Sequence, residues 1–189
     1  MLQLPNMTLV CIDNINIAAA EWAIARSAEQ IEFGKVLHLK IDTIRSKEDY
    51  SKFIFKTLIN YIETDFCLIV QYDGYVLHPE LWKPEFLNYD YIGAPWWYSD
   101  SYNVGNGGFS LRSRKLLKAI ASRNWAIYHP EDECICRRYR RFLEQHFDIR
   151  FAPESLAATF SFEPHAPFSK YEFNDNTFGF HGIPELIMK

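Results

Sequence analysis

The sequence lacks the features of a membrane, secreted or nucleic-acid-binding protein. No apolar run approaches the roughly 18 residues that indicate a membrane span. The first ten residues, MLQLPNMTLV, contain no basic region followed by an apolar one. The 20 basic and 24 acidic residues give a net charge of -4, whereas nucleic-acid-binding domains are as a rule basic. We therefore expect a cytoplasmic protein with no integral membrane segment and no nucleic-acid partner.

Cysteine is scarce, and its spacing does not suit a metal site. The chain has four cysteines, Cys11, Cys67, Cys134 and Cys136. The last two are two positions apart on an expected helix, where such neighbours point to different faces. We therefore predict reduced thiols with a structural role.

The chain does have enough apolar sequence for a core, and it is rich in aromatic residues. Its 189 residues are 48% hydrophobic, which suits one domain with a sizeable core. The five Trp, eleven Tyr and fifteen Phe make up 16% of the chain, and several lie in segments without core periodicity. Surfaces of that kind often receive sugars or nucleobases by stacking.

The first seventy residues alternate between strand and helix patterns. Apolar, β-branched runs predict strands at residues 7–13, 35–41 and 66–70, and composition or spacing predicts helices at residues 17–30 and 46–63. Gly34 is expected to separate the first helix from the second strand, and Ser46, with Asp49 three residues later, to cap the second helix. Short crossovers imply parallel pairing. We therefore predict an α/β fold with a mainly parallel central sheet flanked by helices, in the manner of a nucleotide-binding fold.

The third of these strands ends abruptly at a carboxylate. Asp73 follows the apolar residues 66–70 within the sequence Gln71-Tyr72-Asp73-Gly74. An ionised carboxylate beside an apolar core is costly unless a metal, a cation or several N–H donors compensate it. The carboxyl ends of such strands are also where α/β sheets bind ligands. Asp73 is therefore either a ligand-binding residue or, because Asp and Gly are favoured turn residues, part of a simple turn.

The second half of the chain is less regular. We predict strands at residues 90–93, 109–112 and 159–163, and helices at residues 113–122 and 131–146. Glu131, Asp132 and Glu133 open the last helix, where acidic groups suit the helix dipole without any further role. The tightest glycine cluster is at residues 105–108, and His181 lies between glycines in the sequence FGFHG.

These landmarks stand in an order that resembles the GT-A glycosyltransferases. The shared elements of that fold are a DxD motif, a glycine-rich loop, an acidic xED motif and a C-terminal histidine. The sequences VQYDGYVLHPELW and VGNGGFSLRSRK resemble a bacterial family of uncharacterised glycosyltransferase-like domains with QxDG in place of DxD. The resemblance covers nearly the whole chain. It implies a single GT-A (Rossmann-like) domain over residues 1–189, with a nucleotide-binding half at 1–74 and an acceptor and catalytic half at 75–189.

The resemblance implies that Asp73 and His181 hold a divalent cation, Mn²⁺ or Mg²⁺, which contacts the diphosphate of a nucleotide-sugar. Gln71 matches the first acid of DxD but is neutral, so the site has one fewer charge with which to hold a hard cation. We therefore expect weak metal binding, or binding that depends on oxygens from the diphosphate. An imidazole ligand would favour Mn²⁺ over Mg²⁺. The alternative for His181 is an ordinary surface or core histidine.

The xED match implies that Asp132 is the general base of an inverting transfer, the group that removes the proton of the acceptor hydroxyl. A helix N-terminus lowers the pKa of a carboxyl group, so we expect Asp132 to be ionised. Glu131 would then hold the acceptor. Acidic helix starts are common without any catalytic role, and this reading stays open.

The remaining assignments concern the donor and the acceptor. The fold receives the base and ribose of a nucleotide at the loop of Asp13 and Asn14, and Tyr50, Lys52 and Lys56 lie on the helix that leads to the third strand. Asn106 and Gly107 would approach the donor sugar or the acceptor through their amide groups; alternatively they form a type I′ hairpin turn. A final group of aromatic residues, Trp96, Trp97, Tyr98 and Tyr102, is either a stacking platform for the acceptor sugar or the core of its own loop.

The resemblance thus predicts a metal-assisted glycosyltransferase of the hexosyl- or deoxyhexosyltransferase class. Its donor would be a nucleotide diphosphate sugar, first of all a UDP-sugar, and its acceptor a carbohydrate or lipid-linked glycan in polysaccharide biosynthesis. A sugar-1-phosphate nucleotidyltransferase would need a glycine-rich, basic loop after the first strand, which residues 13–16 lack. A non-catalytic nucleotide-sugar or carbohydrate-binding GT-A domain is the other alternative, and the neutral Gln71 favours it.

Overall fold

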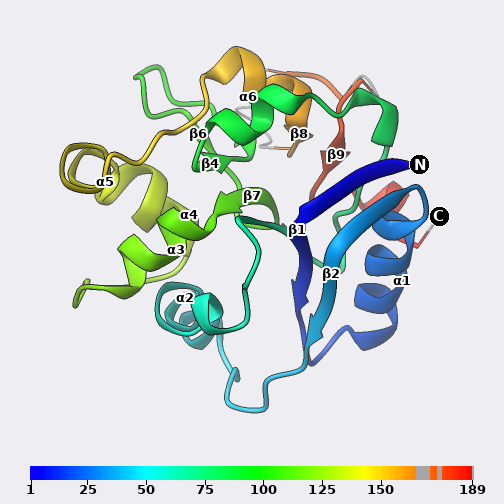
Figure 1. Ribbon diagram of the computed structural model, residues 1–189, viewed down its shortest axis with the longest axis horizontal. Helices are drawn as coiled ribbons and strands as arrows, with labels where there is room; N and C mark the ends of the chain where they lie inside the picture. The colour runs from blue at the N-terminus through cyan, green and yellow to red at the C-terminus, as the bar shows by residue number, and fades with distance from the viewer. Residues whose placement is uncertain (165–170, 174–175, 189) are drawn as a thin grey trace.

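The computed structural model describes residues 1–164, 171–173 and 176–188, and its first part alternates strands and helices as the sequence predicts (Figure 1). The Ser46 hydroxyl caps the second helix and accepts a hydrogen bond from the Asp49 N–H at 3.0 Å, as the spacing predicts. That helix ends at Lys56, earlier than expected, and a 3-10 turn follows it. These elements are β1 (Leu2–Ile12), α1 (Ile17–Ala28), β2 (Ile31–Leu39), α2 (Lys47–Lys56), the 3-10 turn (Leu58–Asn60) and β3 (Phe66–Val70).

The first two strands begin earlier than their apolar runs predict. They pair in parallel from their first residues, with a shift of register between Leu4 and Thr8. A Cβ atom on Gly34 would lie only 1.9 Å from the carbonyl oxygen of Pro5 at this irregularity, so the close approach requires a glycine. Gly34 therefore lies inside β2 and does not separate it from α1, contrary to our prediction.

The central sheet is mixed, which corrects the expectation of a mainly parallel one. Its five strands have the order β2-β1-β3-β7-β4, with β4 at Tyr91–Ile92 and β7 at Phe109–Ser113. The pairs of β1 with β2 and with β3 are parallel, whereas β7 is antiparallel to both β3 and β4. The chain reaches β7 through an irregular segment and not through a helical crossover, so its direction can reverse. As a result, the start of β7 lies beside the carboxyl end of β3, where Val70 pairs with Phe109.

Two small sheets accompany the central one. The strand expected at residues 90–93 is confirmed as β4 of the central sheet, and a separate short strand, β5 (Ala94–Pro95), follows it and pairs with β6 (Val104–Gly105). The expected strand at residues 159–163 is wrong for its first part, because α6 (Glu154–Phe160) continues to Phe160. Only β8 (Ser161–Phe162) is extended, and it pairs in parallel with β9 (Gly179–Phe180).

The helix predicted at residues 131–146 is interrupted. It consists of α4 (Glu131–Glu133), a π-helical turn at Cys134–Arg138 and α5 (Arg140–Phe147). The earlier helix, α3 (Arg114–Ala121), begins after its Ser113 cap, and the Ser113 hydroxyl accepts from the Leu116 N–H at 3.0 Å. Insertions of π-helix are frequent at functional sites. All four cysteines are buried and free, as predicted.

The sheet separates two hydrophobic clusters, because successive residues of a strand point to opposite faces. Val10 and Ile69 face the cluster beneath α2, α3 and α5, whereas Leu9 and Leu68 face the cluster beneath α1 and α6. Figure 1 shows α2, α3 and α5 on one side of the sheet and α1 on the other. Both clusters include residues of β1 and β3. The loop of residues 13–16 follows β1 and the segment Gln71 to Gly74 follows β3, so both begin at strands that are packed on each face.

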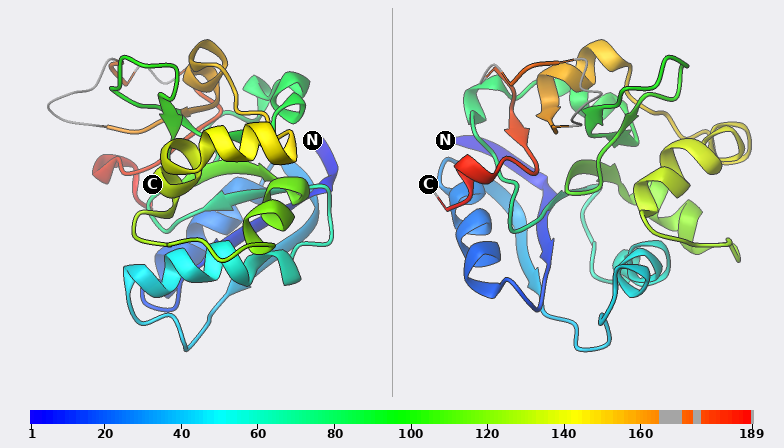
Figure 2. Two further views of the ribbon diagram at one scale, coloured as in Figure 1. Left: turned by 90° about the vertical axis from the view of Figure 1, so that its left-hand side faces the viewer. Right: turned by 180° about the vertical axis from the view of Figure 1, so that it is seen from behind.

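The C-terminal segment returns to the end of β3. Phe180 packs edge to face on Tyr75, whose ring also meets Trp22 of α1, and the Tyr75 hydroxyl donates to the Leu186 carbonyl at 3.0 Å. Figure 2 shows this last segment beside α1 when the molecule is seen from behind. This packing places residues 179–182 beside the segment that follows β3. Among residues 1–164, 171–173 and 176–188, no helix is long and apolar enough to cross a membrane.

Candidate active site

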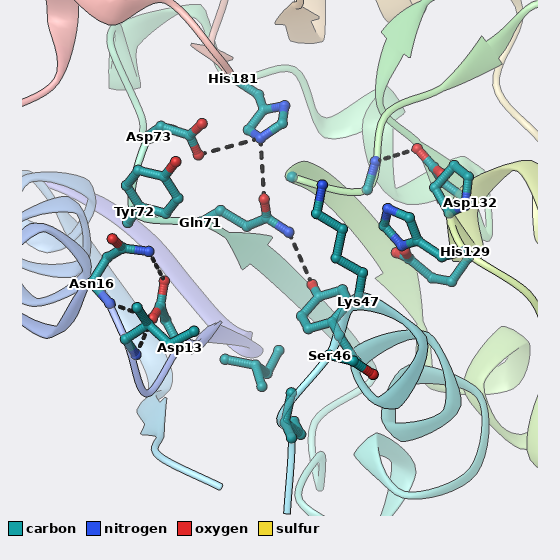
Figure 3. A pocket seen from close by; sticks show the side chains of 18 of the residues that line it. Asp13, Asn16, Ser46, Lys47, Gln71, Tyr72, Asp73, His129, Asp132 and His181 are labelled. Carbon is teal, nitrogen blue, oxygen red and sulfur yellow. Dashed lines mark hydrogen bonds and ion pairs between the residues drawn. The ribbon is translucent and has the colours of Figure 1, made fainter. Parts of the chain in front are cut away.

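A cavity of about 680 Å³ opens at the carboxyl ends of β1 and β3 (Figure 3). The antiparallel direction of β7 brings the glycine loop before it to the same edge of the sheet, and the C-terminal segment adds a histidine. Eight of the nine residues that the sequence singled out as site residues line this cavity: Asp13, Asn14, Gln71, Asp73, Gly107, Glu131, Asp132 and His181.

One end of the cavity holds a histidine between two carboxylates. His181 Nε2 lies 3.3 Å from Asp73 Oδ1 and 3.2 Å from Gln71 Oε1, and its Nδ1 lies 2.7 Å from Glu163 Oε1. Tyr50 completes the cluster, because its hydroxyl accepts a hydrogen bond from Gln71 Nε2 at 3.2 Å. That bond turns the amide oxygen of Gln71 toward His181.

Glycines give the histidine its place. A Cβ atom on Gly108 would lie 2.2 Å from the His181 ring, and one on Gly74 would lie 2.6 Å from the carbonyl oxygen of Phe180. Backbone bonds fix the same segment, since the Gly182 N–H donates to the Asp73 carbonyl at 3.0 Å. Any side chain at residue 108 would push the imidazole away from Asp73.

The donor atoms of this end suit a divalent cation. Asp73 Oδ1 is buried and has no hydrogen-bond partner among the described residues, although it faces His181 Nε2. Gln71 Oε1 converges on the same point, and Glu163 holds the other ring nitrogen in the carboxylate–histidine arrangement that supports metal ligands. Within residues 1–164, 171–173 and 176–188, no three His, Cys, Asp or Glu side chains are placed to hold a metal. A third donor would be the neutral amide of Gln71, so the three donors, Asp73, His181 and Gln71, would include only one carboxylate.

The same carboxylates favour a protonated imidazole. Burial alone would lower the pKa of His181, but the carboxylates of Asp73 and Glu163 beside the ring outweigh it and raise the pKa to about 10. A proton and a divalent cation would therefore compete for Nε2, because a metal binds the neutral imidazole.

Asp132 lies at the other end of the cavity and is 8% exposed. Its Oδ2 accepts a hydrogen bond from the Gly107 N–H at 2.8 Å, and its Oδ1 accepts from the Glu133 N–H at 2.9 Å. Burial, followed by the charges of Glu131 and Glu163, raises the pKa of Asp132 to about 7. Our expectation of a lowered pKa is wrong, because α4 has only three residues and these effects exceed that of the helix terminus.

Glu131 is held by an arginine that the sequence analysis missed. Arg112 lies near the end of β7 with 0% of its side chain exposed, and its Nη2 donates to Glu131 Oε1 at 2.8 Å. Its Nε donates to Ser110 Oγ at 3.0 Å, and its guanidinium lies 5.2 Å from the centre of the Tyr91 ring. Glu131 is therefore paired within the chain and lies against Gly107, where a Cβ atom would be 2.6 Å from its Oε1. The sequence signal that could have identified Arg112 is a charged residue within a strand that was expected to be buried.

Asn106 is the ninth of these residues and does not line the cavity. Its side chain is fully buried, and its Oδ1 accepts from the N–H groups of Gly108 and Phe109 at 2.9 and 3.3 Å. The predicted type I′ hairpin is also wrong. Asn106 has a φ of 72° but Gly107 has no positive φ, and β6 and β7 pair with different strands. Asn106 shapes the loop, and Gly107 faces the cavity.

The two loops at the nucleotide end are fixed by side-chain hydrogen bonds. Asp13 Oδ1 accepts from the N–H groups of Ile15 and Asn16, both at 2.7 Å. Asn14 Nδ2 donates to the carbonyl oxygens of Ile41 and Ile44 at 3.1 and 3.2 Å. These bonds tie the loop after β1 to the loop after β2, so the two loops form one wall.

The aromatic residues divide between the two roles that the sequence left open. Trp96 is only 4% exposed and packs in the core, whereas Trp97 is 36% exposed; both reach the cavity. The Trp97 ring stacks on Tyr98 at 4.8 Å, and the Arg137 guanidinium lies 3.4 Å from the centre of the Tyr98 ring on its way to Asp100. Trp97 therefore has a ring that is exposed to solvent at the cavity and is held in place by its stacking on Tyr98.

The basic residues of α2 that line the cavity are not those that we named. Lys52 and Lys56 do not line it, whereas Lys47 does, together with Arg45 just before the helix. His129 also lines the cavity, and its Nδ1 lies 3.3 Å from Ser51 Oγ. Helical spacing alone could not show which face of α2 meets the cavity.

The fold resembles that of a glycosyltransferase of known structure. The chain matches the crystal structure of a glycosyltransferase involved in the glycosylation of the major capsid of PBCV-1, with a TM-score of 0.55, 12% identity, and coverage of 93% of this chain and 91% of that one. The predicted resemblance to glycosyltransferases is thus confirmed for the fold. A weaker match, to A197 from STIV, has a TM-score of 0.38 with 11% identity over 78% of this chain and 82% of that one, and it carries no argument.

The sequence also defines the family. Residues 34–181 match the family model described as a protein of unknown function (DUF5672), and the chain belongs to this family. The matched region begins inside β2 and ends at His181, so it contains most of the cavity but not the loop after β1. No curated protein matches the chain in sequence.

Proposed function

We propose that the protein is a glycosyltransferase that moves a sugar from a nucleotide diphosphate sugar to a hydroxyl of a glycan acceptor, with inversion at the anomeric carbon. The observation that carries the proposal is Asp132, a buried carboxyl group with a pKa near 7 that shares a cavity with the cluster of Asp73, Gln71 and His181. A general base is most effective when its pKa lies close to the working pH. The glycosyltransferase fold supports the same conclusion.

In the proposed reaction the acceptor hydroxyl gives its proton to Asp132 while its oxygen forms a bond to the anomeric carbon. The bond from that carbon to the diphosphate breaks, and its electron pair leaves with the diphosphate oxygen. The N–H groups of Gly107 and Glu133 hold both oxygens of Asp132 in place. Because Glu131 is already paired with Arg112, it serves in this account to position Asp132 and the glycine loop instead of holding the acceptor.

The donor would lie along the floor of the cavity. We place its base and ribose, first of all uridine, against the wall that Asp13 and Asn14 form, and its diphosphate beside Asp73. A divalent cation would be held by Asp73 and His181 with the amide oxygen of Gln71, and when bound it would neutralise charge on the leaving diphosphate. The low charge of this donor set favours a cation that is held jointly with the diphosphate.

The acceptor would enter over Trp97. The indole is exposed at the cavity and is supported by Tyr98 and Arg137, an arrangement that suits the apolar face of a sugar ring. We therefore favour a carbohydrate or a lipid-linked glycan as acceptor.

The direct test is to incubate the protein with UDP-sugars and GDP-sugars in the presence of Mn²⁺. We expect binding of at least one donor and slow release of its nucleotide diphosphate, and we expect Asp132→Asn to bind the donor without releasing it. Failure of every nucleotide-sugar to bind at millimolar concentrations would refute the proposal.

The second candidate is a non-catalytic domain that binds nucleotide-sugars, and the neutral Gln71 beside His181 is the observation that favours it. A wild-type protein that binds donor but releases no diphosphate with any acceptor, in water or in a glycan mixture, would support this candidate. The Asp132→Asn comparison separates the two, because only an enzyme loses turnover.

A further inference from the structure

Most charged groups that face the cavity already have a partner of opposite charge or a hydrogen bond within the chain. Asp73 and Glu163 face His181, and Glu131 is paired with Arg112. Lys47 differs, because its ammonium group has no hydrogen bond or ion pair anywhere in the described part of the chain. Figure 3 shows its side chain rising from α2 into the cavity. The Lys47 ammonium is therefore a cation at the cavity that no described residue neutralises.

The helix fixes where this cation lies. Lys47 and Tyr50 are three residues apart, so they share one face of α2. The Tyr50 hydroxyl contacts Gln71 Nε2 at 3.2 Å, and Gln71 in turn contacts His181. Lys47 thus belongs to the face of α2 that meets Gln71, at the end of the cavity where Asp73 lies.

This position explains why Gln71 is neutral. A carboxylate at residue 71 would attract the Lys47 ammonium. It would also bind a protonated His181 or a metal ion more strongly than the amide does. An amide of the same length keeps the contacts to Tyr50 and His181 without a charge. The neutral Gln71 therefore leaves Lys47 available to an anion that enters the cavity.

We propose that Lys47 binds the diphosphate of the nucleotide donor and supplies part of the positive charge that a more tightly held metal ion would otherwise bring. This proposal rests on the proposed function and extends it, because it names the group that meets the diphosphate. An ammonium group is a suitable phosphate ligand as a compact charge. Arg45, which also lines the cavity and has no carboxylate partner for its guanidinium among the described residues, adds to the same field.

The test is calorimetric titration with UDP, uridine and inorganic pyrophosphate, each with EDTA and again with Mn²⁺. Lys47→Met should weaken UDP and pyrophosphate binding in EDTA at least about tenfold, the loss expected for one charged hydrogen bond, and should leave uridine binding unchanged. Lys52→Met is the matched control, because Lys52 is an exposed lysine of the same helix that does not line the cavity. It should bind all three ligands like the wild type.

Gln71→Glu supplies a test of opposite sign. The new carboxylate should weaken UDP binding in EDTA, because it competes for Lys47, and should strengthen binding of Mn²⁺ alone. Equal UDP and pyrophosphate affinities in wild type and Lys47→Met would overturn the inference while leaving the proposed function intact. A wild-type protein that binds neither UDP nor pyrophosphate, with or without Mn²⁺, would also overturn the inference, and it would overturn the proposed function only if every nucleotide-sugar failed to bind as well.

Discussion

The buried pair of Arg112 and Glu131 makes the sharpest prediction about this site, through the variant Arg112→Met. Methionine keeps most of the volume of the arginine stem but leaves Glu131, only 3% exposed, without its partner. Removing one member of a buried ion pair costs about 3–5 kcal/mol. Arg112 Nη1 is itself buried without a hydrogen-bond partner among the described residues, and its removal returns part of that cost, roughly 1 kcal/mol or more. We therefore expect a net loss of about 3 kcal/mol, the lower end of the range for such pairs.

A loss of this size is easily measured. For a chain of this length it lowers Tm by about 6–12 °C, at about 2–4 °C for each kcal/mol. The matched variant is Arg112→Met combined with Glu131→Met, in which neither charge remains; it should recover most of the lost stability, because apolar residues of similar volume replace a buried ion pair at little cost. Urea unfolding followed by circular dichroism compares the three proteins. A fall in stability below about 1 kcal/mol for Arg112→Met, or a double variant no more stable than the single one, would refute the account of this pair.

Three further predictions concern the two ends of the cavity and its entrance. Gly108→Ala places a Cβ atom 2.2 Å from the His181 ring, so it should lower Mn²⁺ affinity in calorimetry at least about tenfold, the usual effect of disturbing a metal ligand; unchanged affinity would show that His181 is not a ligand. Because burial raises the pKa of Asp132 from 3.8 to about 7, the unfolded chain loses this proton first and the folded protein loses stability as the pH rises from about 4 to about 7. Asp132→Asn should therefore have a higher Tm than the wild type at pH near 8 but not at pH near 4. The kcat/KM of the wild type should rise with pH through about 7, as Asp132 loses its proton. The opposite trends would contradict the ionisation that we assign to Asp132. Trp96→Ala should destabilise the protein by about 3–5 kcal/mol, while Trp97→Ala should cost far less and raise the KM for the acceptor; equal thermal stabilities would show that the two indoles do not differ in burial as described.

The first half of the fold could be predicted from the sequence because its signals are local. Apolar runs of residues 7–13 and 66–70, with a capped helix at Ser46, identify strands and helices without knowledge of their neighbours. The direction of β7 could not be predicted in this way, because a short apolar strand reads the same in either direction. Similarly, Gly34 marks a close approach to Pro5, and only the paired strands show that this glycine lies within β2.

For the site, too, the local sequence predicted some features, and others depended on the tertiary structure. The order of Asp73, Asp132 and His181 along the chain predicted that they belong to one site, and they do line one cavity. The pKa of Asp132 was mispredicted because its burial and the nearness of Glu163 depend on the tertiary structure. Lys47 was missed for the same reason, since any of three lysines on α2 could have faced the cavity until the helix was docked on the sheet.

The central claim is that Asp73 and His181 meet the diphosphate of a donor whose sugar lies within reach of Asp132. A crystal structure of the protein with UDP and Mn²⁺ tests it most directly. We expect the cation to contact Asp73 and His181 at distances typical of such ligands, about 2.0–2.5 Å, with the uracil against the loop of Asp13 and Asn14 and the terminal phosphate oriented toward Asp132. UDP bound outside this cavity, or a cation that contacts neither Asp73 nor His181, would contradict the claim.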